Sequence, residues 1–295
     1  MSNLTPPSPA QVRARLIFGC GYVGHRAAIQ WRQMGHRVTV VTRSVERSRA
    51  LADEGLKTIV ADVTQPATLT DLPAAKLVLF AVGFDRRRPG SIGDVYAGGI
   101  KHVLDALPLD TGRVIYVSST GVYGHSDGDW IDEDTPPRPT REGGHACLAA
   151  EQVLFAHSLG ERGVVLRFAG IYGPGRVPRQ EDVRAGKPIT GNGDGILNLI
   201  HVDDAVEAIL AAESRATPPR IYNVSDGNPA PRRAYYEELS RLLDAPPPRF
   251  SPLGEAGSQR ARGADDKRVS NLRMVNELGV TLRYPSFREG LSAIM

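Results

Sequence analysis

The sequence predicts an α/β fold built on a doubly wound parallel sheet, with a smaller C-terminal region, and three observations support this prediction. Short apolar runs alternate with stretches of helical periodicity along most of the chain. The apolar runs are nearly continuous, which is typical of parallel strands covered on both faces. A G-x-G-x-x-G motif lies between the first apolar run and the first helical stretch. Together these features are typical of a Rossmann-type sheet.

The composition is that of an ordinary globular protein. The 295 residues are 41% hydrophobic and 23% charged. A formal charge of +3 is too small to indicate a nucleic-acid partner. No apolar run is long enough to cross a membrane. The two cysteines, Cys20 and Cys147, have no metal-ligand spacing, so we expect no metal site and reduced thiols in a cytoplasmic protein.

The periodicity places the elements in order. Strands are predicted at 16–18, 37–42, 57–60, 77–81, 113–118, 164–168 and 221–224. Helices are predicted at 23–34, 92–107, 144–159, 232–243 and 271–278, with another starting near Ala205. An aspartate of the sequence His201-Val202-Asp203-Asp204 is expected to cap the helix that starts near Ala205.

The glycine motif predicts a dinucleotide site. Gly19 would allow a tight turn, Gly21 would let the backbone approach a pyrophosphate, and Gly24 would let the helix pack close to the sheet. The helix that begins at Tyr22 and Val23 would hold the phosphates with its N–H groups and its positive end. The alternative is a tight turn without a ligand.

The residue after the second strand bears on the choice of cofactor. An acidic residue near this position takes the ribose hydroxyls of NAD, whereas an arginine suits the 2′-phosphate of NADP. Arg43 therefore favours NADP, with NAD and a solvated basic loop as alternatives. Asp62 would either cap the next turn or reach the adenine. The further residues expected to line the cofactor site are Asp62, Val63, Ala81, Val82 and Gly83.

Two segments at predicted strand ends carry polar chemistry. Arg86 and Arg87 follow the fourth strand, where they could hold a phosphate or a carboxylate or form a solvated charged loop. Ser118, Ser119 and Thr120 end the fifth strand, where they could either face the nicotinamide or cap a local turn.

The order of several motifs resembles a known family. After the glycine loop come Val117-Ser118-Ser119-Thr120-Gly121-Val122-Tyr123-Gly124, Arg167-Phe168-Ala169-Gly170-Ile171-Tyr172-Gly173-Pro174-Gly175, His201-Val202-Asp203-Asp204, Tyr222-Asn223-Val224 and Lys267-Arg268-Val269-Ser270-Asn271. The set resembles the extended short-chain dehydrogenase/reductases, also called the NAD-dependent epimerase/dehydratase family. The resemblance covers nearly the whole chain after Arg15.

The resemblance implies a Rossmann domain that binds NAD(P) and a smaller substrate region. It gives Ser119 the role of the catalytic serine, which hydrogen-bonds the reacting oxygen. The family also uses a Tyr-x-x-x-Lys pair, in which the tyrosine is the acid/base and the lysine lowers its pKa. In this sequence Gly143 and Cys147 stand at those two positions, and no tyrosine or lysine occurs between Thr135 and Phe155. The chain therefore resembles an atypical subgroup that lacks the pair.

Other side chains are candidates for the chemistry. The catalytic candidates are Ser119, Thr120, Tyr123 and His145. Histidine has a suitable unperturbed pKa, although His145 is better suited to a surface position at a helix start, and Tyr123 is more often structural in the family. The candidates for holding an anionic substrate are Arg86, Arg87, Tyr172 and Arg176.

These inferences give a predicted organisation and function. Residues 1–14 form a flexible tail, 15–175 form the NAD(P)-binding domain, to which the chain returns around 196–224, and 176–195 with 225–295 form the substrate region. We expect an NAD(P)-dependent reductase, epimerase or dehydratase acting on a small polar, anionic compound such as a nucleotide sugar. The alternative is a non-catalytic NADP-binding regulatory protein. Helices on the outer face of the sheet could form a homodimer.

Overall fold

The computed structural model describes residues 13–87, 89–125, 127–251 and 266–295, so most of the predicted tail lies outside the described residues. The chain divides into two compact units. The first unit comprises the described residues of Met1–Ser118 together with Ala146–Leu166 and Ile209–Ile221, and the second comprises those of Ser119–His145, Arg167–Ala208 and Tyr222–Met295. The predicted domain boundaries differ from this division. The predicted boundaries separate a cofactor-binding part from a substrate-binding part, and this assignment of ligands stays a prediction.

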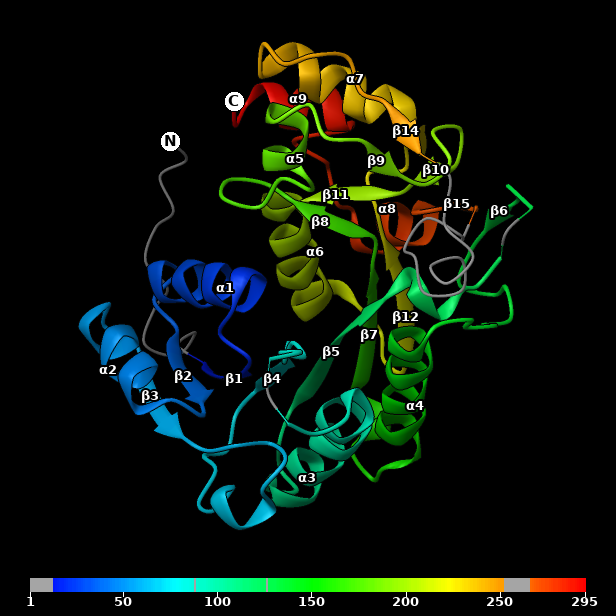
Figure 1. Cartoon of the computed structure of the whole chain (residues 1–295). Coiled ribbons are helices and arrows are strands. Elements are labelled where there is room, and N and C mark those ends of the chain that lie inside the picture. The colour runs from blue at the N-terminus through cyan, green and yellow to red at the C-terminus, as the bar shows by residue number, and fades with distance from the viewer. Residues whose placement is uncertain (1–12, 88, 126, 252–265) are drawn as a thin grey trace. The chain divides into compact units, whose positions relative to one another are not determined.

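The first unit is built on the central parallel sheet, whose seven strands have the order β12-β7-β5-β4-β1-β2-β3. The strands are β1 (Ala14–Phe18), β2 (Arg37–Thr42), β3 (Lys57–Val60), β4 (Leu77–Phe80), β5 (Arg113–Ser119), β7 (Gly163–Phe168) and β12 (Arg220–Val224). The helices that follow these strands are α1 (Tyr22–Gln33), α2 (Val45–Asp53), α3 (Gly99–Ala106), α4 (Glu142–Ala156) and α6 (Val202–Arg215). Figure 1 shows strands and helices alternating along the chain from blue to green.

Strand β1 lies between two parallel neighbours. Phe18, its last residue, is paired with Val41 of β2 and with Phe80 of β4. Because the chain passes from β1 to β2 on one side and reaches β4 on the other, β1 and β4 border the point where the strand order reverses. Ligands of open α/β sheets bind at the carboxyl ends of the strands at such a point.

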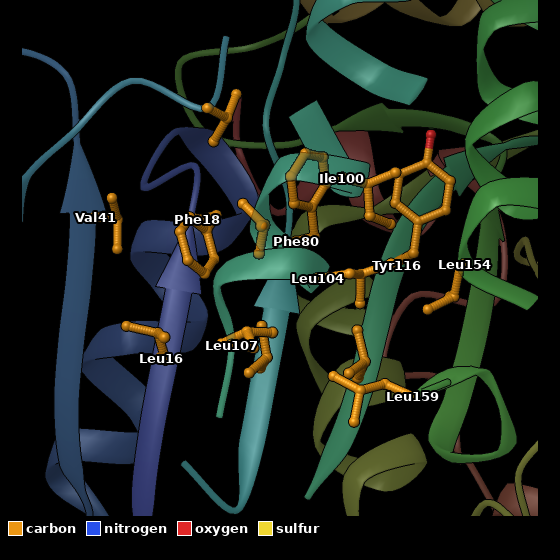
Figure 2. Close-up of a cluster of buried hydrophobic side chains, with 14 of the residues drawn as sticks. Leu16, Phe18, Val41, Phe80, Ile100, Leu104, Leu107, Tyr116, Leu154 and Leu159 are labelled. Atoms are coloured by element: carbon orange, nitrogen blue, oxygen red, sulfur yellow. The ribbon is translucent and has the colours of Figure 1, made fainter. Parts of the chain in front are cut away.

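One face of the sheet is covered by α3 and α4. Alternate residues of β1, Leu16 and Phe18, pack into a buried cluster that Figure 2 shows. Phe80 and Tyr116 continue this cluster on β4 and β5, with ring centroids 5.9 Å apart. The helices contribute the buried side chains of Ile100, Val103, Leu104, Ala150 and Leu154.

The opposite face is covered by α1 and by the end of α6. Ile17 points toward α1, since a Cβ at Gly24 would lie 3.6 Å from its Cγ2 atom. The indole Nε1 of the fully buried Trp31 donates to the Glu213 carboxylate over 2.6 Å. The same carboxylate pairs with the buried guanidinium of Arg15. Helices therefore cover both faces, as a doubly wound sheet requires.

Arg113 fastens the end of α6 to β5. Its guanidinium donates to the backbone carbonyls of Ala212, Glu213 and Ala216, the last over 2.7 Å. The last carbonyls of a helix have no partner within the helix, so a cation that hydrogen-bonds them stabilises the helix end.

The second unit consists of short strands and helices around a core of its own. Its elements are β6 (Trp130–Ile131), β8 (Gly170–Tyr172), α5 (Gln180–Arg184), β9 (Ile189–Thr190), β10 (Ile196–Leu197), β11 (Leu199–His201), β13 (Ala230–Pro231), α7 (Arg232–Leu242), β14 (Phe250–Ser251), β15 (Arg268–Val269), α8 (Leu272–Leu278) and α9 (Phe287–Ser292). Helix α7 contacts α5 and α9, as Figure 1 also shows. Tyr172, Tyr235, Leu239 and Phe287 lie in the core beneath them.

The seven predicted main strands and the predicted helices are confirmed, with some boundaries shifted. The helix expected at 92–107 begins with a π-helical turn at Asp94–Gly98. The expected aspartate cap near Ala205 is wrong, because α6 begins at Val202. The Asp204 carboxylate instead accepts the backbone N–H groups of Arg283 and Tyr284 over 2.8 and 2.9 Å.

Replacing Phe80 by alanine tests the sheet core. Phe80 is fully buried against Phe18 and Tyr116. Truncating a buried phenylalanine costs about 3–5 kcal/mol, because apolar contacts are lost and a cavity remains. We expect Phe80→Ala to lower the free energy of unfolding, measured by denaturant titration, by this amount. Leu109→Ala, at a side chain that is 78% exposed, is the control and should change it by less than about 0.5 kcal/mol. Equal effects of the two substitutions would contradict the described core.

Candidate functional site

The glycine loop between β1 and α1 is held by two close backbone contacts. Gly19 has a φ of +91°, and a Cβ there would lie 2.4 Å from the backbone carbon of Ala81. A Cβ at Gly24 would lie 2.2 Å from the carbonyl oxygen of Gly19. Both distances are too short for any side chain, so β1, α1 and the end of β4 can approach each other only with glycine at these two positions.

Gly21 differs from Gly19 and Gly24 because no other segment crowds the position that its Cβ would take. A Cβ at Gly21 would have no atom within 4 Å, and the same is true of Gly83 after β4. Gly21 is the N-cap of α1 and offers no side chain to the first N–H groups of the helix, whose first turn contains Tyr22 and Val23. The loop is therefore an open cradle at the positive end of a helix, which fits the pyrophosphate of a dinucleotide.

Cys20 lies within this loop. It is partly buried, and burial raises the pKa of its thiol to about 11. The thiol is therefore protonated at neutral pH and is a weak nucleophile. This agrees with an inert packing role rather than with an oxidation-sensitive switch.

Arg43 directly follows β2 and is exposed. Its guanidinium lies 3.6 Å from the carboxylate of Asp85, in the loop after β4. The same carboxylate accepts a hydrogen bond from Nε of Arg87 over 3.0 Å, and this bond is the main reason that the Asp85 pKa is lowered. The loops after β2 and β4 thus share one carboxylate between two arginines. Arg86 is exposed in the second of these loops.

The remaining predicted cofactor residues line the same edge of the sheet. Asp62 accepts the Thr64 N–H over 2.9 Å, so it does cap the next turn, while its contact with adenine stays a prediction. The Val63 carbonyl oxygen lies 2.8 Å from Nδ1 of His102. Ala81 continues the sheet, since its N–H donates to the Phe18 carbonyl over 2.7 Å. Val82, which follows it, is half-buried.

One residue that holds the loop after β4 was not predicted from the sequence. Tyr96 lies on the π-helical turn, and its hydroxyl accepts a hydrogen bond of 3.4 Å from the Phe84 N–H. π-Helical turns inside helices are frequent at functional sites. The several glycines around Tyr96 in the sequence, Gly93, Gly98 and Gly99, were the available signal of an irregular helix.

Ser119 is the last residue of β5 and is half-buried. Its Oγ accepts the Gly121 N–H over 3.0 Å, so the hydroxyl oxygen is fixed while its proton can still be donated. Thr120 is 8% exposed at the start of the following turn. His145 is exposed on the first turn of α4.

Tyr123 is completely buried in a polar network of the second unit. Its hydroxyl donates to Oδ1 of Asn223 over 3.1 Å and accepts from Arg167 over 2.6 Å. Burial raises its pKa, although the Arg167 charge opposes this. With its hydroxyl committed on both sides, Tyr123 is better suited to holding the network than to exchanging a proton with a substrate.

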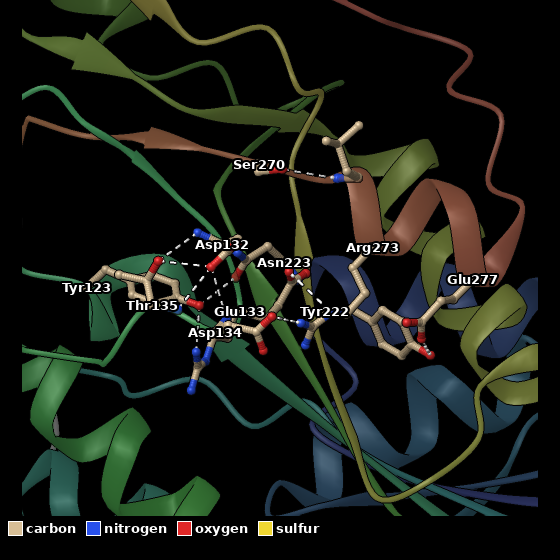
Figure 3. A network of polar contacts seen from close by, with 12 residues as sticks. Tyr123, Asp132, Glu133, Asp134, Thr135, Tyr222, Asn223, Ser270, Arg273 and Glu277 are labelled. Carbon is tan, nitrogen blue, oxygen red and sulfur yellow. Dashed lines mark hydrogen bonds and ion pairs between the residues drawn. The ribbon is translucent and has the colours of Figure 1, made fainter.

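Glu133 supports the same network from the loop around β6. Its carboxylate accepts the Asn223 N–H over 2.6 Å and lies 3.6 Å from Nε of Arg273 (Figure 3). Burial raises its pKa, and these two contacts oppose that shift. The role of Glu133 was not predicted, because its partners are about 90 and 140 residues away in sequence.

The structure does not support Tyr172 as a residue that contacts substrate. The side chain is completely buried in the core of the second unit, edge-on to the ring of His201 with centroids 5.4 Å apart. Its hydroxyl donates to the Ser286 carbonyl over 3.4 Å, and a Cβ at Gly290 would lie almost on top of it. Tyr172 is therefore a core residue. Arg176 is exposed, in a tight turn closed by backbone hydrogen bonds with Gly173.

Neither a membrane-spanning helix nor a metal-binding cluster is found among the described residues. None of the helices among the described residues combines the length and apolar character needed to span a bilayer. Within the same residues, no group of three or more histidine, cysteine or acidic side chains is arranged to hold a metal ion.

The sheet order and the glycine cradle define a dinucleotide-binding α/β protein. The family model of the NAD-dependent epimerase/dehydratase family matches residues 16–225. The chain belongs to this family, and it is an NAD(P)-dependent enzyme of the epimerase, dehydratase and reductase type.

The chain is also similar to three individual proteins along nearly its whole length. It is 30% identical over 280 residues to protein YeeZ of Escherichia coli, covering 91% of this chain and 95% of YeeZ. It is 31% identical over 313 residues to a 3-diazoavenalumate denitrifying reductase of a Streptomyces species, covering 95% and 99%. A solved structure of a conserved protein of unknown function from Silicibacter pomeroyi matches with a TM-score of 0.77 at 27% identity, covering 96% and 98%.

The roles of Gly21 and Gly24 can be distinguished by substitution. Gly21 has a φ of −93°, which other residues adopt, and it has free space around it. We expect Gly21→Val to leave the thermal stability nearly unchanged but to lower the affinity for NADP(H), measured by calorimetry, at least tenfold, because the side chain fills the space of the pyrophosphate. Gly24→Ala is the matched comparison and should destabilise the fold instead. Wild-type affinity in a folded Gly21→Val protein would show that no pyrophosphate lies on this loop.

Proposed function

We propose that the protein is an NADP(H)-dependent reductase of a small, anionic, electron-poor acceptor such as an activated carbonyl compound. The observation that carries this proposal is the absence of any tyrosine or lysine between Thr135 and Phe155. Oxidation of an alcohol, with which an epimerase or dehydratase of this family would begin, needs a base that removes the hydroxyl proton. Reduction of an electron-poor acceptor depends less on such a group, because water can deliver the proton.

The relative named as a reductase supports the same direction. Its similarity to this chain extends over nearly the full length of both proteins. The acceptor named for that relative is not transferred to this chain, because the residues that would choose the acceptor are not identified by the similarity. What is carried over is the class of reaction, a reduction.

The preference for NADP over NAD rests on Arg43. A bound nicotinamide cofactor would supply the hydride. Gly19, Gly21 and Gly24 would hold its pyrophosphate, and Arg43 would pair with the 2′-phosphate at the end of β2. Arg43 is exposed, and its contact with Asp85 is a long ion pair of 3.6 Å, so its guanidinium can turn to a phosphate at little cost.

Ser119 would polarise the acceptor. Its Oγ is fixed by the Gly121 N–H, so the hydroxyl proton can be aimed at an oxygen on which negative charge develops. A positioned donor of this kind stabilises the transition state without itself transferring a proton. The arginines Arg86, Arg87 and Arg176 stay candidates for the anionic group of the substrate, with Arg87 already engaged by Asp85.

Substituting Arg43 tests the cofactor preference. Loss of a charge-assisted hydrogen bond costs about 1.5–3 kcal/mol, so Arg43→Asp should weaken NADPH binding about 10- to 100-fold. NADH binding should change little, and the ratio of the two dissociation constants, measured by fluorescence titration, should fall accordingly. Arg49→Asp makes the same change of charge on α2 and should leave the ratio unchanged. Equal affinities of the unmodified protein for NADPH and NADH would overturn the preference.

Turnover tests the reductase proposal. NADPH absorbance is followed with carbonyl compounds that carry a carboxylate or a phosphate, and with nucleotide sugars. We expect one NADPH consumed for each product molecule, and Ser119→Ala to lower kcat about 100-fold. Ser214→Ala removes a hydroxyl that bonds only carbonyls of α6 and should leave kcat unchanged. Turnover without net NADPH consumption would favour an epimerase or a dehydratase, and binding without turnover would favour the regulatory alternative.

A further inference from the structure

Arg232, the first residue of α7, is a buried cation that has no partner among the described residues. The residue is only 6% exposed. A guanidinium carries five N–H donors, yet within the described chain this one makes neither a hydrogen bond nor an ion pair, and its Nε is completely covered. Burying a charge without pairing it is costly. Such a group is therefore expected to have an external partner.

The surrounding charges do not neutralise Arg232. Burial lowers its pKa, Tyr236 and Asp266 oppose this shift, and Arg179 adds to it. Its neighbour Arg233 is already engaged, since it pairs with Asp194 over 3.6 Å and stacks on the ring of Phe250. Arg232 also stands at the positive end of an eleven-residue helix whose N-cap, Pro231, offers no side-chain acceptor.

A glycine-rich loop passes close to the guanidinium of Arg232. Gly191 has a φ of +123°, and a Cβ there would lie 3.0 Å from Nη1 of Arg232. A Cβ at Gly195 would lie 3.9 Å from Nη2. A side chain at position 191 would therefore crowd Nη1, whereas glycine places no side chain there.

The same loop is fixed to the start of α7. The Arg232 N–H donates to the Gly195 carbonyl over 2.8 Å, and the Arg233 N–H donates to the Gly193 carbonyl over 2.7 Å. Strands β10 and β13 pair directly beside these bonds. The backbone of Arg232 and the loop beside it are thus held in place before any ligand arrives, which lowers the entropic cost of binding.

We propose that Arg232 and the Gly191–Gly195 loop form an oxyanion subsite that binds a phosphate or carboxylate group of a small molecule. The planar guanidinium fork matches two oxygens of either group, and binding would compensate the buried charge. The subsite uses none of the three arginines Arg86, Arg87 and Arg176. That its natural occupant is the anionic part of the substrate rests on the proposed reductase function, whereas the existence of the site does not.

Binding of simple anions tests the subsite without cofactor or turnover. The intact protein is titrated with inorganic phosphate and, separately, with acetate, by calorimetry and by thermal unfolding at constant ionic strength set with NaCl. We expect phosphate, acetate or both to raise the unfolding temperature of the wild type, and the stronger ligand identifies the anion class. Arg232→Met should lower the affinity at least tenfold. It should unfold at the same or a higher temperature than the wild type without anion, because an unpaired buried charge is gone.

Two further variants keep the test decisive. Arg233→Met, at the exposed neighbour, should bind anions within twofold of the wild type, and Arg232→Lys, which keeps the charge without the fork, should bind with intermediate affinity. Unchanged anion affinity in Arg232→Met or in Arg232→Lys would overturn the proposal. So would a lower unfolding temperature of Arg232→Met without anion, since that would give Arg232 a structural role. A positive result with no NADPH turnover would leave the subsite standing and refute only the reductase.

Discussion

The close approach of backbone to backbone at Gly19 is the constraint on which the first unit depends. One neighbour, Ala81, comes from the end of β4, and the other, Gly24, comes from the first turn of α1. A methyl group at either glycine would separate these segments. Because the three segments meet where the strand order reverses, their contact also leaves the opening around Gly21 and Gly83. The same packing that closes the fold therefore leaves the opening in which we propose that the dinucleotide lies.

Several buried polar groups of the second unit are hydrogen-bonded to one another or to the backbone. Tyr123, Arg167, Asn223 and Glu133 are linked by hydrogen bonds, and Asp204 holds the backbone at Arg283 and Tyr284. Hydrogen bonds between buried polar groups favour one arrangement of the chain. Groups bonded in this way are also poorly suited to proton transfer, since every change of protonation would break a bond.

The sequence was informative where structure depends on neighbouring residues and less so elsewhere. β2 and β3 were predicted at their observed bounds, because short runs rich in valine, isoleucine and threonine favour strands locally. Tyr172 was assigned to the substrate on its position in a motif, whereas its burial depends on α9, more than a hundred residues later. Arg232 gave no signal either, because only the fold of a distant loop makes an arginine at a helix start a buried one. Asp204 resembled a helix cap for the same reason, since its backbone partners lie about 80 residues away.

The hydrogen bonds of Glu213 and Arg113 bear on how the protein is made. Arg15 and Trp31 find their common partner about 180 to 200 residues further along the chain. A polypeptide leaves the ribosome from its N-terminus, so β1 and α1 emerge long before the end of α6 exists. Until then Arg15 lacks its carboxylate, and the part of the sheet face that the end of α6 covers stays open. The first unit therefore cannot be completed during synthesis before residue 213 has left the ribosome. Contacts between residues so far apart in sequence form slowly, and the incomplete unit is prone to aggregation until they form.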